Sequence, residues 1–158
     1  MLQFDNKGLL IPNEVITSNI EEFRNTYVFN ERRADLYATY LDFLREINQL
    51  ELGSFFQWID GSFVTQKPFP KDIDLVTFVD FSVHKYKNSR LQNLKDKYKH
   101  YGIDAYFETY YPINHPFYPK YLYQNDYWFK LYSLTKPLGQ QQLMLRKGLI
   151  QIDFNNER

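Results

Sequence analysis

The sequence predicts a single α/β (α+β) domain, a mixed sheet of about five to seven strands flanked by helices. Two observations lead to this prediction. Short apolar runs bounded by turn residues alternate with segments whose apolar residues recur at helical spacing. The chain has 158 residues, of which 44% are hydrophobic, enough to form one core, and it contains no repeat or linker. We therefore treat residues 1–158 as one domain.

The first fifty residues predict a hairpin followed by two helices. Turn residues 5–8 lie between two short apolar runs, which favours a β-hairpin. Ser18 and Glu21 have the spacing of a capping box, so we expect a first helix to begin near residue 19. Apolar residues at helical spacing predict a second, longer helix over residues 31–50.

Two strands of the central sheet are expected over residues 55–59 and 73–81. The second is nearly continuously apolar, as is typical of a strand buried on both faces. The loop over residues 63–71 contains Pro68 and Pro70, so it cannot form an ordinary helix.

The second half of the chain continues the alternation of helices and strands. A polar helix over residues 83–101 leads to an alternating strand over residues 103–108. A crossover of this length permits parallel pairing of that strand with residues 73–81. Residues 121–134 predict a last helix, and residues 143–154 predict a terminal hairpin whose basic turn we place in solvent.

Charge and cysteine content limit the possible functions. Lys plus Arg equals Asp plus Glu at 19 each, so any basic surface for a nucleic acid must be local. The absence of cysteine excludes disulfides, thiolate zinc sites and a cysteine nucleophile. No apolar stretch approaches the ~20 residues of a membrane span, and the N-terminus does not resemble a signal peptide. We expect a cytoplasmic protein with no membrane partner.

Two segments have both a functional and a structural interpretation. The helix over residues 83–101 carries six Lys or Arg side chains against one Asp. It is either an electrostatic surface for a nucleic-acid acceptor or a crossover helix with a solvated basic face. The Tyr-rich stretch over residues 106–132 either stacks on a base or packs as core and lid.

The residues that indicate chemistry lie between Asp60 and Asp74. Asp72 and Asp74 are two apart on a strand, so both carboxylates face one way. Adjacent acids repel each other, and a bound cation would relieve that repulsion. The Gly61-Ser62 turn offers backbone N–H groups and a hydroxyl to an anion, and we expect Asp60 to cap this turn. Together these features outline a nucleotide-phosphate site with Mg²⁺.

This pattern resembles the polymerase-beta-type nucleotidyltransferase superfamily, in which hydrophobic-Gly-Ser and Asp-hydrophobic-Asp-hydrophobic are about ten residues apart. Here Ile59-Asp60-Gly61-Ser62 is followed by nine residues and then by Asp72-Ile73-Asp74-Leu75. The short length is similar to the minimal nucleotidyltransferases of bacteria and phages. Many relatives place an Ala-Arg-Gly helix after the Gly-Ser, which this chain lacks. Lys67 and Lys71 either grip the triphosphate in its place or are solvated loop lysines.

The resemblance implies that Asp72, Asp74 and Asp104 are the catalytic residues and the ligands of two Mg²⁺ ions. It also implies that Gly61 and Ser62 hold the leaving phosphates. The implied enzyme is a nucleotidyltransferase that moves a nucleoside monophosphate from a nucleoside triphosphate, with ATP favoured, to a hydroxyl of a protein or tRNA. By the same analogy, it would act in a toxin–antitoxin or phage-defence pair, with the other member of the pair as its partner.

Two other classes of protein stay open. The first is a catalytically inactive nucleotidyltransferase fold that serves as a protein-binding module. The presence of all three acids opposes it, whereas the altered spacer after Ser62 favours it. The second is a purely structural role, with Asp72 and Asp74 as exposed acids near a turn. The apolar run over residues 73–78 argues against exposure of that strand.

Overall fold

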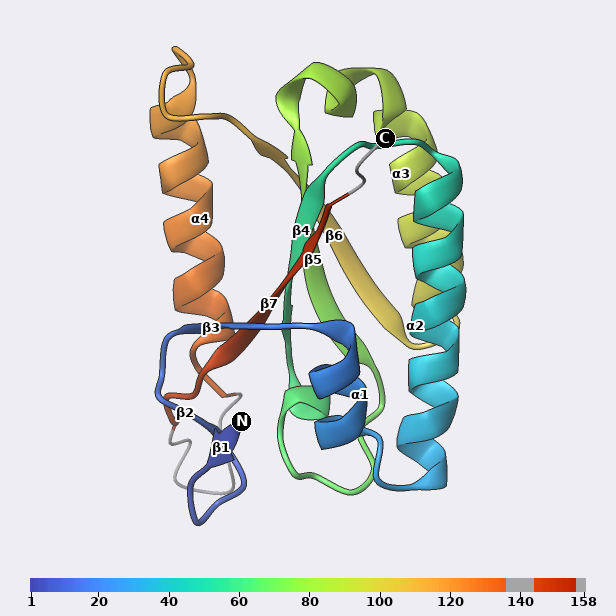
Figure 1. The fold of residues 1–158 in the computed structure, drawn as a ribbon, viewed down its shortest axis with the longest axis vertical. Coiled ribbons are helices and arrows are strands. Elements are labelled where there is room, and N and C mark those ends of the chain that lie inside the picture. The colour runs from blue at the N-terminus through green and yellow to red at the C-terminus, as the bar shows by residue number, and fades with distance from the viewer. Residues whose placement is uncertain (136–143, 156–158) are drawn as a thin grey trace.

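The computed structural model describes residues 1–135 and 144–155, and in this part of the chain a five-stranded mixed sheet is flanked by helices, which confirms the predicted class. The sheet strands are β3 (Val15–Ser18), β4 (Phe55–Asp60), β5 (Ile73–Asp80), β6 (Ile103–Tyr110) and β7 (Leu149–Phe154). The helices are α1 (Ile20–Tyr27), α2 (Glu31–Gln49), α3 (Phe81–Lys99) and α4 (Tyr118–Tyr132). The strand order is β3-β7-β4-β5-β6, and α4 lies across the sheet from α2 and α3 (Figure 1).

A small hairpin precedes the sheet, as predicted. β1 (Gln3–Phe4) pairs antiparallel with β2 (Leu10–Ile11). The side chain of Asp5 accepts two backbone hydrogen bonds within the turn. A bridge between Leu9 and Thr65 attaches the hairpin to the loop that follows β4. The hairpin therefore supports the segment between the two central strands.

The first helix begins at a different cap from the one predicted. The side chain of Asn19 accepts the backbone N–H of Glu22 at 2.8 Å, so Asn19 is the N-cap. Ser18 instead donates its hydroxyl to the Glu22 carboxylate at 2.5 Å. The capping-box prediction was therefore one residue out of register, because Asn caps a helix as well as Ser does.

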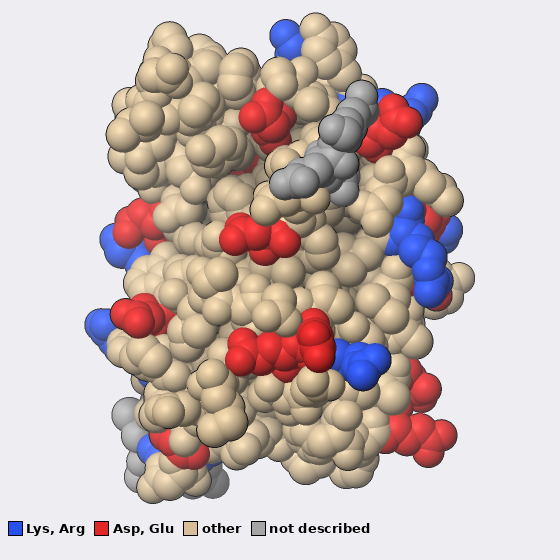
Figure 2. All heavy atoms as spheres, in the orientation of Figure 1, with Lys and Arg blue, Asp and Glu red and all other residues tan. Residues whose placement is uncertain are grey.

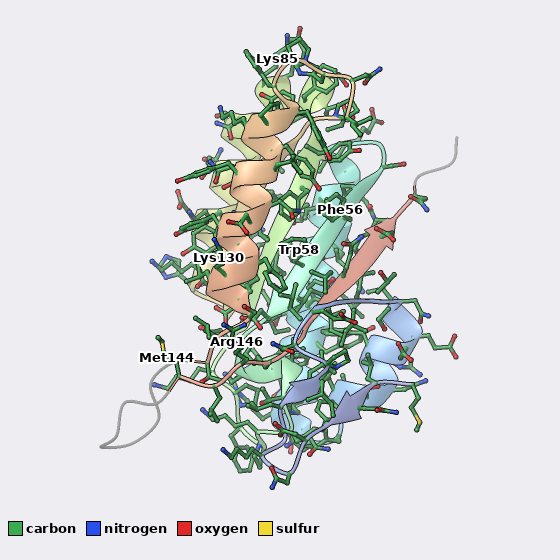
Figure 3. All side chains as sticks on the ribbon, turned by 90° about the vertical axis from the view of Figure 1, so that its left-hand side faces the viewer. Phe56, Trp58, Lys85, Lys130, Met144 and Arg146 are labelled. Atoms are coloured by element: carbon green, nitrogen blue, oxygen red, sulfur yellow. The ribbon has the colours of Figure 1, made fainter. Side chains whose placement is uncertain are left out.

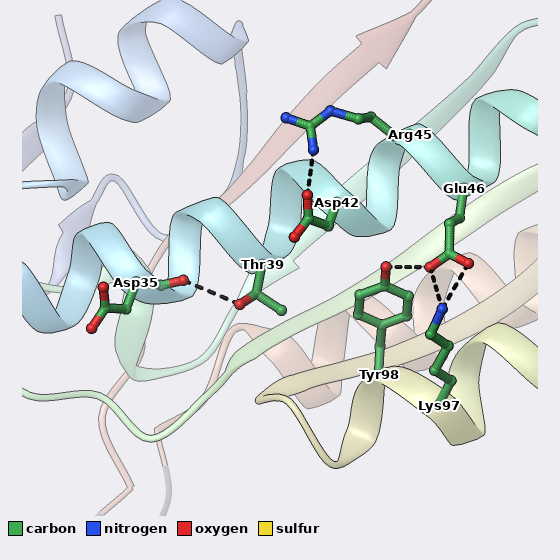
Figure 4. A network of polar contacts seen from close by, with 7 residues as sticks. All are labelled: Asp35, Thr39, Asp42, Arg45, Glu46, Lys97 and Tyr98. Atoms are coloured by element: carbon green, nitrogen blue, oxygen red, sulfur yellow. Dashed lines mark hydrogen bonds and ion pairs between the residues drawn. The ribbon is translucent and has the colours of Figure 1, made fainter.

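A surface contact joins α2 to α3. Glu46 of α2 accepts hydrogen bonds from Lys97 at 2.9 and 3.0 Å and from the hydroxyl of Tyr98 (Figure 4). The hydrogen bond from Tyr98, and then that from Lys97, lowers the pKa of Glu46. This contact places Lys97 on the side of α3 that faces α2.

The sheet separates two clusters of buried side chains. Ile73 and Leu75 of β5 pack with α1, α2 and α3, whereas Val76 and Phe78 pack on the other face with α4. Trp58 of β4 lies on this second face, beside α4 (Figure 3). Alternate residues of β5 are thus buried on opposite faces, which explains its continuous apolar sequence.

The predicted terminal hairpin is wrong. β7 lies between β3 and β4, parallel to the first and antiparallel to the second. Residues 144 and 145 are not in a strand, and residue 143 lies outside the described residues. Leu149 and Ile150 are both buried although neighbouring residues of a strand face opposite ways. Burial on both faces is typical of an interior strand, which has a neighbouring strand on each side. One neighbour of β7 is β3, and with four residues β3 was too short to predict from the sequence.

Arg33 of α2 is fully buried and holds the loop between β4 and β5. Its guanidinium donates to the carbonyl oxygens of Tyr27, Phe63, Thr65 and Lys67 at 2.6 to 3.0 Å. Burial lowers the pKa of Arg33 to about 10, so the side chain is charged at neutral pH. These bonds explain how a loop with two prolines is ordered without a helix.

We expect Arg33→Met to reduce the free energy of unfolding by about 3 kcal/mol or more, because several buried carbonyl oxygens lose their donor. Urea denaturation would measure the loss. Arg45→Met is the matched control, since Arg45 lies on the same helix with 69% of its side chain exposed and, among the described residues, forms an ion pair with Asp42 alone. Its cost should stay within about 0.5 kcal/mol. Equal losses in the two variants would contradict the role given to Arg33.

Candidate functional site

Three carboxylates form a row across β4, β5 and β6 at one end of the sheet. Asp60 pairs with Asp74 in the antiparallel register of β4 and β5, and Asp74 pairs with Asp104 in the parallel register of β5 and β6. The parallel pairing predicted from the length of the crossover is confirmed. Paired residues share a face, and neighbouring strands lie ~4.8 Å apart, so the row spans ~10 Å on the face that α4 covers.

Gly61 brings the backbone of the turn against Asp74. Its φ is +78°, and an added Cβ would overlap the Asp74 carboxylate. Glycine is therefore required both by the backbone conformation and by the closeness of that side chain. Ser62 follows and opens a single 3₁₀ turn, Ser62–Val64. The predicted Gly-Ser turn and the second acid of the predicted motif thus lie side by side.

Asp72 and Asp104 line a hollow of about 560 Å³ next to the row. The basic residues that also line it are Arg32, Lys71, Lys99 and His100. Arg32 is fixed there, because it donates to the carbonyl oxygens of Pro70 and Lys71 at 3.1 and 2.7 Å. The hollow combines carboxylates with cationic groups, as a site for a phosphate and its counter-ion would require.

The two lysines predicted to grip a triphosphate are in different places. Lys71 lines the hollow, whereas Lys67 is exposed and is not among the lining residues. The backbone of Lys67 serves the loop instead: its carbonyl accepts from Arg33, and its N–H donates to the Thr65 hydroxyl at 3.1 Å. Of the two, only Lys71 is placed for a phosphate by this geometry.

Asp60 is not the turn cap that the sequence suggested. It ends β4, is buried, and forms an ion pair with Lys147, which is buried as well. Lys147 also donates to the carbonyl oxygen of Tyr132 at 3.1 Å. Burial lowers the pKa of Lys147 to about 7, while the Asp60 carboxylate favours its charged form. Of the basic turn that was placed in solvent, Arg146 is exposed as predicted, whereas Lys147 is buried where the chain entering β7 passes the end of α4.

Two tyrosine hydroxyls border the carboxylates. Tyr132, the last residue of α4, is buried, and among the described residues its hydroxyl has no hydrogen-bond partner. Burial raises the pKa of Tyr132 well above its ordinary value, and the charges of Asp74 and Asp104 raise it further. The pKa of Tyr106 is raised by burial and then by the same two carboxylates. Both hydroxyls are therefore neutral, and that of Tyr132 has a hydrogen bond to give to a ligand.

The oxygen ligands of the site are of the kind that Mg²⁺ prefers. Within the described ranges, however, no group of three or more His, Cys, Asp or Glu side chains is gathered closely enough to hold a metal ion. The register fixes the backbone of Asp74 and Asp104, and Asp72 lies two residues before Asp74. These residues fit the ion in chemistry and in backbone placement, and their side chains would have to turn towards it.

Sequence reasoning missed three residues of the site. Asp60 follows Trp58 by two positions on a strand, so alternation alone would have placed both on one face. No local pattern marks Lys147 or Tyr132. They reach the site through the paths of β7 and α4, which are set by packing.

We expect Gly61→Ala to displace the Asp74 carboxylate. The free energy of unfolding should therefore fall by more than backbone strain alone would cause. Gly53→Ala is the matched control, because Gly53 has a similar φ of +74° while a Cβ there meets nothing within 4 Å. Urea denaturation should show at least about 1 kcal/mol more loss for Gly61→Ala than for Gly53→Ala. Equal losses would mean that the Asp74 side chain moves aside without cost.

The buried pair Asp60–Lys147 can be tested by a double-mutant cycle. Lys147→Met leaves a buried carboxylate without its cation, so we expect a loss of about 3–5 kcal/mol in the free energy of unfolding. Adding Asp60→Asn removes that charge and should recover part of the loss. Purely additive losses, measured by denaturation of the two single variants and the double variant, would contradict the pairing.

Comparison with known proteins assigns the chain to a family. Residues 2–153 match the model of the family of unknown function DUF6932, and the chain belongs to that family. Neither a curated protein nor a solved structure gave a match. Among the described residues, no helix is both long enough and apolar enough to cross a membrane. The activity must therefore be inferred from the residues of the chain itself.

Proposed function

We propose that this member of the DUF6932 family is a Mg²⁺-dependent nucleotidyltransferase. It would move a nucleoside monophosphate from a nucleoside triphosphate, with ATP favoured, to a hydroxyl acceptor on a protein or tRNA. The observation that carries the proposal is the juxtaposition of Asp74 with Asp104 in register, with Gly61 against Asp74. It supports the resemblance to the polymerase-beta-type superfamily, because that resemblance needs the Gly-Ser turn and the acids at one site.

The reaction is an in-line displacement at phosphorus. The acceptor hydroxyl attacks the α-phosphorus, the bond from that phosphorus to the β-bridging oxygen breaks, and pyrophosphate leaves. Asp104 accepts the proton of the attacking hydroxyl. Asp72, Asp74 and Asp104 would hold Mg²⁺, which neutralises charge on the attacking and leaving oxygens when it is bound.

The other residues of the site prepare it for the triphosphate. Arg32, Lys71 and Lys99 line the hollow with positive charge, which attracts phosphate oxygens. The backbone of Gly61 and the hydroxyl of Ser62 would hold the leaving phosphates. A loop fixed by Arg33 keeps these groups in place before the substrate arrives.

The setting is inferred from the resemblance alone. We infer a cytoplasmic protein that acts in a toxin–antitoxin or phage-defence pair. In that setting the other member of the pair, or the acceptor itself, supplies specificity for the macromolecule that is modified.

We expect Asp72→Asn and Asp74→Asn each to reduce transfer by at least about 100-fold, because each removes a negative ligand from the site. The protein is incubated with Mg²⁺ and each α-³²P-labelled nucleoside triphosphate in host lysate, and labelled protein is separated from labelled RNA. Asp153→Asn is the matched control, since Asp153 is an exposed acid on β7. It should label like the wild type.

The same experiment distinguishes the rival class. Wild-type labelling by Asp72→Asn or Asp74→Asn would contradict the assigned residues. If the wild type gives no label and does not bind nucleoside triphosphate with Mg²⁺ in equilibrium dialysis, the protein-binding module becomes the better interpretation. Binding without labelling would indicate that the acceptor is missing from the lysate.

A further inference from the structure

A second hollow, of about 590 Å³, lies at the opposite end of α3 from the carboxylates. Phe81, His84 and Asn88 of α3 line it, together with Tyr111, His115 and Phe117 from the connection between β6 and α4. In Figure 3, Lys85, which also lines it, is at the top of the molecule, whereas Arg146, which precedes the site lysine, is in the lower half, and the two hollows share no lining residue. This hollow is therefore separate from the proposed transfer site.

Aromatic rings form one wall of the second hollow. The His115 ring lies 4.3 Å from the ring centre of Phe81 and 4.7 Å from that of Tyr111. Its orientation is fixed, because His115 Nδ1 accepts the backbone N–H of Phe117 at 2.9 Å. The ring of Phe117 stands edge-on to Tyr111 and is 59% exposed. These rings pack against one another, and the exposed ring of Phe117 offers a surface on which a planar ligand can stack.

The second hollow also contains a buried polar atom in need of a partner. His84 is 9% exposed, and its Nδ1 lies 2.7 Å from the Thr109 hydroxyl. Its Nε2 is buried and meets no partner at hydrogen-bonding geometry among the described residues, although Asn88, which also lines the hollow, lies close to the ring. Burial lowers the pKa of His84 and the nearness of Asn88 raises it by less, so the ring is neutral at neutral pH. A planar ligand with hydrogen-bonding groups on its edge, such as a nucleobase, would satisfy both the rings and this nitrogen.

A line of polar and basic side chains connects the two hollows. Lys85, Asn88, Gln92, Lys95 and Lys99 recur every three or four residues of α3, so they share one side of the helix. Lys99 lines the first hollow and Lys85 the second. Between them, Lys95 reaches over β6 to lie 4.3 Å from the ring centre of Tyr106. This side of α3 therefore runs along β6, the edge strand of the sheet.

The length of this path indicates the size of its occupant. Fourteen residues of helix separate Lys85 from Lys99, which corresponds to ~21 Å at 1.5 Å per residue. One nucleoside triphosphate in the first hollow cannot also occupy the second. A stacked single strand rises ~3.4 Å per nucleotide, so about six nucleotides would bridge the two. Cations spaced along a path that ends in aromatic rings match a phosphodiester chain with unpaired bases.

The face drawn in Figure 2 carries scattered acidic side chains, and its described residues include few Lys or Arg. Lys97, on the α2 side of α3, is already paired with Glu46. Lys85, Lys95 and Lys99 on the β6 side form no ion pair with a described carboxylate, so their charge is available to a nucleic acid.

We propose that the β6 edge of the protein binds a single strand of nucleic acid. One unpaired base occupies the second hollow, phosphates lie against Lys95 and Lys99, and the acceptor hydroxyl at the end of the strand reaches Asp72 and Asp104. The position of that hydroxyl rests on the proposed function. The binding of the strand rests only on the residues of α3, of β6 and of the connection that follows it.

Fluorescence anisotropy with labelled oligonucleotides of about 12 nucleotides, without Mg²⁺ or nucleoside triphosphate, tests strand binding. Single-stranded RNA, single-stranded DNA and a blunt duplex are compared. We expect the wild type to bind a single strand more tightly than the duplex, and the two single strands show which sugar is preferred. No binding at low salt, equal binding of the duplex, or equal competition by polyglutamate would overturn the proposal. The last of these results would indicate an acidic peptide.

Variants locate the strand. Phe117→Ala removes an exposed ring and should weaken binding at least about fivefold. Lys95→Gln/Lys99→Gln should weaken binding and reduce the slope of log K against log salt by about 1.4 for a single strand. Arg90→Gln/Lys97→Gln removes the same charge from the other side of α3 and is the matched control. Wild-type affinity in Phe117→Ala, or an equal change of slope in the control, would place the strand elsewhere. Circular dichroism confirms that each variant is folded.

Strand binding and transfer are separable. Asp74→Asn should still bind the oligonucleotide, at least as tightly as the wild type, because it removes a negative charge and no positive charge from the site. If strands bind and no variant or nucleotide gives transfer, the nucleic-acid site stands and the proposed function fails. If transfer is found and strands do not bind, the proposed function stands and the acceptor does not follow the β6 edge.

Discussion

The candidate site depends on the burial of one guanidinium group. A loop with Pro68 and Pro70 cannot satisfy its carbonyl oxygens in a helix, and Arg33 provides the donors instead. Asn30 and Arg32 extend this attachment to the carbonyl oxygens of Pro68 and Pro70. The N-terminal end of α2 therefore determines where β5 begins. The altered spacer after the Gly-Ser turn is accommodated by this network, so the turn and the acids still meet.

The register of β4, β5 and β6 brings three carboxylates close together at the candidate site. Asp60, Asp74 and Asp104 are aligned across the sheet, and like charges at this spacing repel one another. The buried cation Lys147 offsets part of this repulsion, because it forms an ion pair with Asp60. A neutral Tyr132 hydroxyl lies close to the other two acids. Asp74 and Asp104 are the members of the row that the proposed Mg²⁺ would neutralise.

Both hollows are lined in part by residues of the helix α3. One of its sides packs on the sheet, one contacts α2 through Lys97, and one follows the β6 edge through Lys95. Its first residues line the aromatic hollow, and its last residues line the hollow with Asp72 and Asp104. The basic helix, which the sequence left open as a solvated face or a nucleic-acid surface, thus has two different charged sides. Among the described residues, Lys97 on one side is paired with Glu46, whereas Lys95 on the other side lies against the ring of Tyr106.

Local patterns in the sequence determined most of the helices, the buried strand β5, and the parallel pairing that brings Asp104 beside Asp74. Each depends on residues close in the chain, through the periods of helix and strand and through crossover length. Tertiary structure alone decided the place of β7, the alignment of Asp60 in the row and the burial of Lys147. The Asp60–Lys147 pair joins residues 87 positions apart. Such a contact follows from the packing of whole elements, and no local period records it.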